Sequence, residues 1–469
     1  MRFHQNELEP MLTFAETILL AAADPVQDLA LGLLPPRAIV GALACVRPSW
    51  LAAMQRARFR RTLRLVAARS PFYREQFRRR RIRVERIEHP AQLGDFYTTG
   101  EDLRMYGAEA FLIERPDTAF ETTGTTSPVP KRLFFSKREM ERAGKLAALS
   151  LRLLGLKKAD RVASAFDCSF WVSPAVLRAA LNEIGCFHLE AGKIDPQEFH
   201  ARVRVYRPTV IFGEPSWLVR LSETAAANGT WPVKFLFAGG ENIVEQTRRW
   251  IESVWQAPLY LNYGQTEAFG ALGIECPAQD GYHRNDLDFF FEIADADAEG
   301  YGELVYSTLT RSVMPLIRYR AGDLTRLVEE PCTCGWPARR IAKVRARCDE
   351  MVVCGMGNVG PWVFAELLGD SAASEWQATV RHDGVRDVIE LQVETDRSAS
   401  ELEQQTRARL RQRFGDFWKN YEMGLYELRV HVVPHGALRG AQRKLRRIVD
   451  ARPTANGRGS LTLSMGSRQ

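Results

Sequence analysis

Apolar and polar positions follow different rhythms in successive parts of the chain. To about residue 110 the apolar residues recur at helical spacing, as in 63–66, so this part is predicted to be mostly helical. From about 115 to 345, short apolar runs such as 161–166 and 209–212 alternate with helical patterns such as 175–184. Strands that alternate with helices of this length predict a parallel or mixed α/β sheet.

The pattern changes after about residue 350. Segments 378–382 and 388–393 are predicted to be paired strands, 399–414 a charged helix and 426–433 a further strand. The tail from 453 onward is polar, contains Gly and Ser, and is predicted to be disordered. The pattern therefore predicts an α/β chain with a large N-terminal domain and a smaller α+β C-terminal domain.

Composition fits a globular protein of two or three domains. The chain has 469 residues, 45% hydrophobic and 26% charged, against a prior of roughly 150 residues per domain. The net charge of +7 would suit an anionic substrate or partner but does not by itself indicate nucleic acid.

Location is predicted from the N-terminus and the cysteines. Glu7 and Glu9 precede the first apolar run, where a secretory signal has basic residues, and no stretch in 11–46 approaches the ~20 apolar residues of a membrane span. The eight cysteines show no regular framework. We expect a cytoplasmic protein with no transmembrane segment.

An arginine-rich run occupies 78–83. It could bind nucleic acid or phosphate, but no aromatic interleaving or nucleic-acid motif accompanies it. A solvated helix end is the favoured interpretation, and no nucleic-acid partner is expected.

Segment 121–131, Glu-Thr-Thr-Gly-Thr-Thr-Ser-Pro-Val-Pro-Lys, has a composition suited to phosphate. Glycine allows close backbone approach, hydroxyls and N–H groups donate to phosphoryl oxygens, and Lys131 adds positive charge. It is not a Walker loop, because the second glycine is missing and Pro128 and Pro130 forbid immediate helix formation. The alternative is a polar hairpin.

Three further segments carry candidate chemistry. Segment 234–241 is predicted to be a buried strand ending in a glycine turn, where such sheets place their ligands. Segment 262–267, Asn-Tyr-Gly-Gln-Thr-Glu, offers an aromatic plane, a hydroxyl and a carboxylate at a turn, suited to adenine, the α-phosphate and Mg²⁺. Asp323 follows an Arg-rich strand and could accept two ribose hydroxyls, or could be the ion-pair partner of Arg318 or Arg320.

Taken together, the order of four segments resembles the adenylate-forming superfamily: 122–131, 262–267, 302–323 and 347–351. The chain more narrowly resembles the phenylacetate–CoA ligase branch, through 70–74, 101–104 and 442–450. The resemblance covers about 60–452. It implies an N-terminal adenylation domain over 1–346 with a helical extension at 1–60, a hinge at 347–349 and a small mobile C-terminal domain over 350–452, before the tail 453–469.

The resemblance also implies roles for single residues. Glu267 would hold Mg²⁺ and Thr266 would contact phosphate, although a surface or N-cap acid is the alternative for Glu267. Lys444 would bridge the carboxylate and the phosphate during adenylation, where charge must be neutralised, or would belong to a solvated basic helix. Asp349 would be the hinge residue. The residues implied to contact the nucleotide are Thr123, Gly124, Thr125, Thr126, Lys131, Gly240, Glu241, Asn262, Tyr263, Asp323 and Arg347.

Acyl-pocket candidates follow from position along the chain. They are Phe170, Trp171, Phe212, Gly213, Glu214, Pro215, Ala238 and Gly239. Aromatic walls would favour an aryl or otherwise apolar acid, and the alternative is ordinary core packing.

Cys276, His283, Cys332 and Cys334 form a Cys₃His set that could hold a structural Zn²⁺. The Cys-x-Cys spacing differs from that of common zinc fingers. Unligated cysteines, or a His283 that faces the acyl pocket, are the alternatives.

The predicted function is ATP-dependent activation of an organic acid to acyl-AMP, followed by transfer to a thiol, with coenzyme A as the expected acceptor. A carrier protein or an amine is the alternative acceptor, as in specialised metabolism, and a homodimer is a candidate assembly. A different alternative is a non-catalytic nucleotide-binding protein on a ligase fold, since Ser127 and Ala346 replace glycines of the family pattern.

Overall fold

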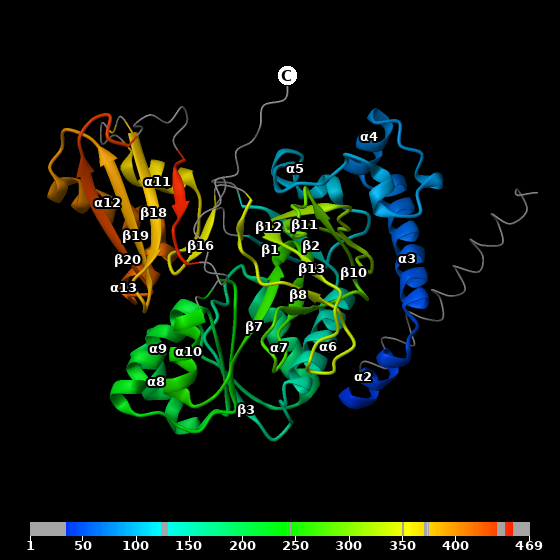
Figure 1. Ribbon diagram of the computed structural model, residues 1–469, viewed down its shortest axis with the longest axis horizontal. Helices are drawn as coiled ribbons and strands as arrows, with labels where there is room; N and C mark the ends of the chain where they lie inside the picture. Colours follow the sequence, from blue (N-terminus) through cyan, green and yellow to red (C-terminus); the bar gives the residue numbers. More distant parts are fainter. Residues whose placement is uncertain are drawn as a thin grey trace, which may run out of the picture.

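A computed structural model describes residues 34–122, 130–241, 243, 245–348, 351–369, 373, 375–438 and 446–453. A large body contains a nine-stranded sheet and a four-stranded sheet, and a smaller lobe contains the C-terminal strands (Figure 1). The N-terminal part is helical, as predicted: α2 (Pro36–Cys45), α3 (Pro48–Arg69), α4 (Pro71–Arg79) and α5 (Gly100–Met105), with the 3₁₀ turns η1 (Val84–Arg86), η2 (Pro90–Leu93) and η3 (Ala108–Phe111).

A nine-stranded mixed sheet forms the centre of the body. Strands β4, β3, β5, β6 and β7 are parallel neighbours, and β7, β8, β9, β14 and β13 continue the sheet antiparallel. Their bounds, in sheet order, are β13 (Leu327–Val328), β14 (Arg340–Ile341), β9 (Tyr282–Arg284), β8 (Gly270–Ile274), β7 (Leu259–Gln265), β6 (Phe235–Gly239), β5 (Val210–Gly213), β3 (Arg161–Ser164) and β4 (Phe187–Glu190).

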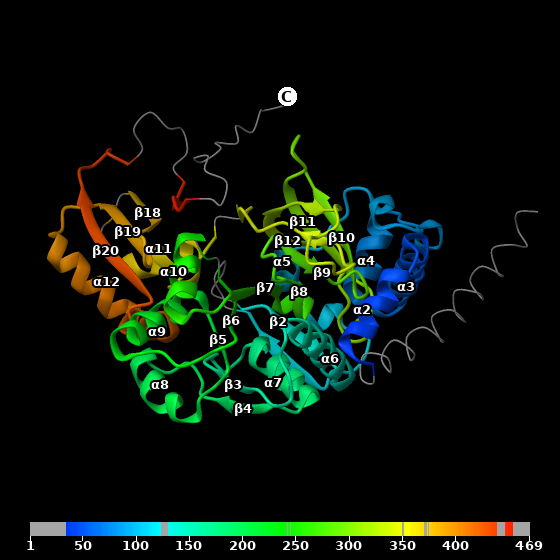
Figure 2. The same ribbon diagram turned by 60° about the horizontal axis from the view of Figure 1, so that its bottom comes forward.

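Helices cover both faces of the parallel strands (Figure 2). Val162 and Phe212 pack with α6 (Lys137–Leu153) and α7 (Val172–Ile184). Their neighbours Ala163 and Ile211 pack in the core shared with the other helices, α8 (Pro196–Val203), α9 (Pro215–Asn228) and α10 (Glu245–Trp255). Because alternate side chains enter two different cores, the middle of β3 and most of β5 are apolar without interruption, which explains the apolar runs in the sequence.

A second, antiparallel sheet follows the order β10 (Phe289–Ala294), β11 (Gly302–Thr308), β12 (Tyr319–Thr325) and β15 (Ala346–Arg347). The strands β1 (Thr118–Glu121) and β2 (Arg132–Phe135) pair as a hairpin, and they flank the predicted phosphate-binding segment in the sequence. Two 3₁₀ turns, η4 (Arg204–Tyr206) and η5 (Thr266–Ala268), complete the body. The second of these directly follows β7 and carries the predicted Thr-Glu pair.

The C-terminal strands and helices enclose a hydrophobic core of their own. Their bounds are β16 (Val352–Cys354), β17 (Gly357–Val359), α11 (Pro361–Leu368), β18 (Glu375–His382), β19 (Asp387–Glu394), α12 (Ala399–Arg413), α13 (Gly415–Glu422), β20 (Tyr426–Val433) and β21 (Ile448–Asp450). The predicted paired strands, helix and further strand are all present. Contacts to the body include Thr247 Oγ1 with His382 Nε2 at 2.7 Å and Arg386 with Glu223 at 2.8 Å.

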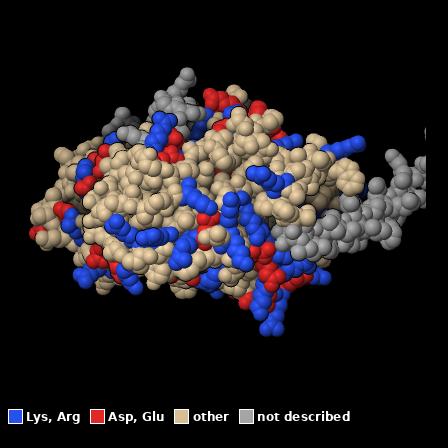
Figure 3. Space-filling view, turned by 90° about the horizontal axis from the view of Figure 1, so that it is seen from below, with Lys and Arg blue, Asp and Glu red and all other residues tan. Residues whose placement is uncertain are grey.

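Two surface predictions concern the N-terminal helices. Among the described residues no single helix is long and apolar enough to span a bilayer; α2 and α3 reach the required length and composition only together, across a 97° bend. Arg78 and Arg79 bind Glu75, and Arg80 binds Asp95. Basic and acidic side chains are interspersed on the face shown in Figure 3. Arg78, Arg79 and Arg80 therefore lie at the end of α4, and each has an acidic partner.

Candidate active site

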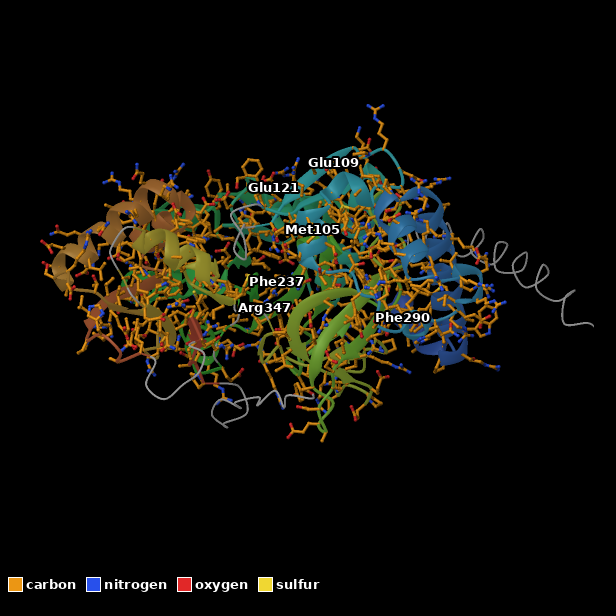
Figure 4. All side chains as sticks on the ribbon, turned by 90° about the horizontal axis from the view of Figure 1, so that it is seen from above. Met105, Glu109, Glu121, Phe237, Phe290 and Arg347 are labelled. Atoms are coloured by element: carbon orange, nitrogen blue, oxygen red, sulfur yellow. The ribbon has the colours of Figure 1, made fainter. Side chains whose placement is uncertain are left out.

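A cavity of about 1770 Å³ opens at the carboxyl ends of the parallel strands. Ligands in open α/β sheets bind at this edge. Most sequence-predicted site residues that the structure describes line it: Lys131, Trp171, Phe212, Glu214, Gly239, Gly240, Glu241, Asn262, Tyr263, Thr266, Glu267, His283, Asp323 and Arg347. In Figure 4, Phe237 and Arg347 lie near the middle of the molecule and Phe290 lies towards the N-terminal helices.

Glu267 is a buried carboxylate with a cation beside it. It lies in η5, and its Oε1 accepts hydrogen bonds from Lys131 Nζ and, at 2.9 Å, from the Tyr319 hydroxyl. Burial alone would raise the pKa of Glu267, but the Lys131 charge and hydrogen bond outweigh it, and the pKa lies below its usual value. Glu267 is therefore ionised at neutral pH. The carboxylate already binds one cation, the Lys131 ammonium. Carboxylate oxygens are also the hard ligands that Mg²⁺ prefers, so Glu267 fits Mg²⁺ as well.

Asp323 is held by three side chains on the same cavity. Tyr263 donates to Oδ2 at 2.7 Å, Gln265 donates to Oδ2 at 2.8 Å, and Arg347 donates to Oδ1 at 2.9 Å. The register of β12 and β15, which pairs Asp323 with Arg347, brings the last contact about. A carboxylate offers about four acceptor positions, so further donors such as ribose hydroxyls have room at Oδ1.

The sequence suggested Arg318 or Arg320 as the ion-pair partner of Asp323, but neither arginine pairs with it. Arg318 binds Glu292 at 3.1 Å and Arg320 binds Glu303 at 2.6 Å. Both arginines therefore have carboxylates of their own, and Asp323 is paired with Arg347.

Glu241 follows β6 and has a different environment. Both of its carboxylate oxygens accept from Ser216 at the start of α9, from the main-chain N at 2.9 Å and from Oγ at 3.0 Å. Burial and, second, the nearby Glu214 raise the pKa of Glu241 to about 8. Glu241 thus holds a proton over much of the neutral range.

Phe170 does not line the cavity, which corrects its assignment to the acyl pocket. Its side chain is 67% exposed, while its main-chain carbonyl accepts from Glu121 N at 3.1 Å. Gly213, Pro215 and Ala238 are not among the residues that line the cavity. A Cβ at Gly213 would stand 2.8 Å from the Trp217 ring, so Gly213 permits close packing of β5 on α9.

Cys276, His283, Cys332 and Cys334 meet in space, although the chain separates them widely. Their ligand atoms lie within 4.8 Å of one another. Cys276 Sγ is 3.6 Å from Cys332 Sγ, and Cys334 Sγ is 3.2 Å from His283 Nε2. The Nδ1 atom of His283 lies 2.6 Å from the Ala338 carbonyl, to which it donates, so Nε2 carries the lone pair that faces the thiols. Burial lowers the pKa of His283, which favours the neutral, metal-binding form.

Several predicted residues lie outside the described ranges. They are Thr123, Gly124, Thr125, Thr126, Asp349 and Lys444. Sequence reasoning missed Tyr319 and Gln265, although both occur within the quoted motifs. The signal was present, since Gln265 precedes Thr266 directly and Tyr319 lies four positions before Asp323.

Comparisons with known proteins agree with this geometry. The family model of the AMP-binding enzymes matches residues 122–287, and that of the AMP-binding enzyme C-terminal domain matches 366–452. A phenylacetate–coenzyme A ligase of Thermus thermophilus is 28% identical over 362 residues, covering 73% of this chain and 81% of the relative. One of Pseudomonas putida is 26% identical over 401 residues, covering 81% and 90%.

A solved structure shares the fold. The crystal structure of 2-hydroxyisobutyryl-CoA ligase, in complex with 2-HIB-AMP and CoA, superposes with a TM-score of 0.70 at 19% identity, over 90% of this chain and 92% of the other. Matches to both family models, in order along the chain, identify the family. The chain belongs to the adenylate-forming superfamily of AMP-binding enzymes, in the branch similar to phenylacetate–coenzyme A ligases.

Proposed function

We propose that the protein is an ATP-dependent acid–coenzyme A ligase. The acid's carboxylate oxygen attacks the α-phosphorus of ATP, the bond to pyrophosphate breaks, and acyl-AMP forms. The thiol of coenzyme A then attacks the acyl carbon and AMP leaves. The single observation that carries the proposal is the ionised Glu267 and the paired Asp323 and Arg347 on one cavity, in a chain whose named relatives are coenzyme A ligases.

The described side chains fit these steps. Asp323 would accept the ribose hydroxyls and Arg347 would face the ribose and α-phosphate, since the two lie side by side. Glu267 would hold Mg²⁺, which when bound neutralises phosphate charge. Lys131, already in contact with Glu267, would add positive charge at the phosphates. We assign to Lys444 the neutralisation of the two anions that meet during adenylation.

Acid-dependent exchange of labelled pyrophosphate into ATP tests the first step, and mass spectrometry of products with coenzyme A tests the second. We expect exchange with at least one acid and its loss in Lys444→Ala, but not in Lys158→Ala, which removes an exposed lysine outside the cavity. No exchange with any acid would refute the proposal. A product formed only with a carrier protein or an amine would keep the adenylation and replace the acceptor.

We further propose that the Cys276, His283, Cys332 and Cys334 cluster binds a structural Zn²⁺. The 3.6 Å between two of its sulfurs is close to the roughly 3.8 Å of thiolates around a tetrahedral zinc with bonds of about 2.3 Å. The ion would join β8 and β9 to the loop before β14. Elemental analysis should find about one zinc per chain, reduced in Cys334→Ser but not in Cys186→Ser, which lies outside the cluster. Native protein without zinc would dismiss the site.

A cytoplasmic location and a homodimer stay predictions. Size-exclusion chromatography with light scattering tests the assembly, and a single mass of about 53 kDa would contradict the dimer.

A further inference from the structure

A buried ion pair lies on the cavity wall where an acyl group would be expected to lie against apolar side chains. Lys193 follows β4 and Glu214 follows β5, and Lys193 Nζ donates to Glu214 Oε2. The Lys193 side chain is 8% exposed and that of Glu214 is 25% exposed. Both line the cavity, together with the aromatic rings of Phe212 and Phe237.

Lys193 is fixed in position by its own loop. The indole Nε1 of the fully buried Trp217 donates to the carbonyl of the next residue, Ile194, at 2.9 Å. Burial would lower the pKa of Lys193, but Glu214 and then Glu241 more than offset this, so the pKa lies above its usual value. The ammonium therefore stays charged, and the backbone beside it is anchored at Ile194.

The carboxyl groups on this wall offer more hydrogen-bond acceptors than the described residues of the protein use. Among the described residues, one oxygen of Glu214 is bound by Lys193, and no side chain or main-chain group donates to Oε1. Glu241 and Asp167 also line the cavity, so carboxyl groups outnumber the single lysine. An apolar acyl group pressed against this wall would strip water from Glu214 without replacing its hydrogen bonds, which is unfavourable.

We propose that Glu214, positioned by Lys193, selects an acid that carries a hydrogen-bond donor, an amino or hydroxyl group, at the end remote from its reacting carboxylate. The aromatic rings would pack on the body of the acid, and Glu214 Oε1 would accept from the donor. This inference rests on the proposed ligase function, and it replaces the expectation of an aryl or other apolar acid with an acid that is polar at its far end. A purely structural ion pair that holds the loop after β4 is the competing explanation.

Matched acids separate these explanations. The probes are phenylacetate and benzoate with a 4-amino, 4-hydroxy or 4-methyl substituent, each measured by acid-dependent pyrophosphate exchange. A site that hydrogen-bonds a substrate donor discriminates strongly against the analogue that lacks it. We expect kcat/KM for the better of the amino and hydroxy acids to exceed that of the methyl acid by about 100-fold, and the comparison of amino with hydroxy identifies the donor.

The double variant Lys193→Met/Glu214→Met removes the pair without leaving a charge unpaired. We expect the ratio of donor-bearing to methyl acid to fall to within about threefold of one, mainly through a higher KM for the donor-bearing acid. The matched control is Arg178→Met/Glu190→Met, which removes an ion pair near the end of β4 but outside the cavity, and should leave the ratio unchanged.

Three outcomes decide the inference. A wild-type enzyme that prefers the methyl acids overturns it, even where the double variant fails to fold. An unchanged ratio in a folded double variant also overturns it and leaves the pair a structural one. Exchange with no acid at all would instead refute the ligase function on which the inference rests.

Discussion

Glu267 and Glu241 are both carboxyl groups that follow neighbouring strands, β7 and β6, and line the same cavity. Their pKa values nevertheless move in opposite directions, below the usual value for Glu267 and up to about 8 for Glu241. Glu267 contacts a lysine, whereas Glu241 faces Glu214 and shares Lys193 with it. Burial acts to raise the pKa of both carboxyl groups, and only at Glu267 does a neighbouring cation, Lys131, outweigh it.

The difference divides the cavity into two functional regions. On the side of Glu267, Asp323 and Arg347, an ionised carboxylate and a carboxylate–guanidinium pair suit Mg²⁺, ribose and phosphate. On the side of Glu214 and Glu241, carboxyl groups are in excess and one of them holds a proton. That side suits a donor on the acid rather than a phosphate.

Replacing each of the two carboxyl groups by an amide should give the largest contrast. We expect Glu267→Gln to lower kcat/KM for pyrophosphate exchange by about 100-fold, because an amide is a poor Mg²⁺ ligand. Glu241→Gln should lower it less than about tenfold, since the amide resembles the protonated acid and keeps its contact with Ser216. Equal losses in the two variants would break the comparison.

Removing Lys131 tests whether this lysine keeps the buried Glu267 carboxylate charged. Lys131→Met leaves a buried carboxylate without its cation, held by Tyr319 and by its own main-chain N–H, so we expect about 3 kcal/mol less free energy of unfolding at pH 7. Because the pKa of Glu267 is lowered in the folded state, its contribution is present above the unfolded value and is lost as pH falls through the folded value. The loss on Lys131→Met should therefore shrink in acid. Denaturant unfolding at pH 7 and pH 4 measures both, with Lys158→Met as the control.

The raised pKa of Glu241 predicts the smallest effect. Between the usual value of 4.5 and about 8, the folded protein holds a proton that the unfolded chain has released. The free energy of unfolding should therefore decrease as pH rises through this window, by at most about 1.4 kcal/mol per pH unit from this group. Thermal unfolding at pH 6, 7 and 8 should show a shallower decrease in Glu241→Gln. The same slope in both proteins would mean that Glu241 is not the group that titrates.

Local sequence patterns predicted the succession of strands and helices, and the family resemblance supplied the candidate residues on the nucleotide side of the site. Segment 262–267 is a strand followed by a turn, so its residues reach the cavity together wherever the strand lies. The Cys₃His set was predictable from residue types, because few other arrangements need three thiols and an imidazole. In both cases the information is carried by neighbouring residues or by unusual side-chain chemistry.

Lys193 was not predictable by the same reasoning. It lies 21 residues before Glu214 in no recognisable motif, and only the order β4, β3, β5 in the sheet brings the two together. Phe170 shows the reverse error, since its position along the chain suggested a pocket wall but the residue is 67% exposed. Which side of a loop faces a cavity depends on packing against distant elements. The local sequence pattern does not contain this information.

The fate of the acid's oxygen tests the central claim most directly. An acid with ¹⁸O in its carboxylate, incubated with ATP, Mg²⁺ and coenzyme A, should transfer one ¹⁸O to AMP, because that oxygen attacks the α-phosphorus and stays on it when the thiol displaces AMP. Mass spectrometry should find label in AMP and none in pyrophosphate. Unlabelled AMP, or label in inorganic phosphate, would contradict adenylation at this site.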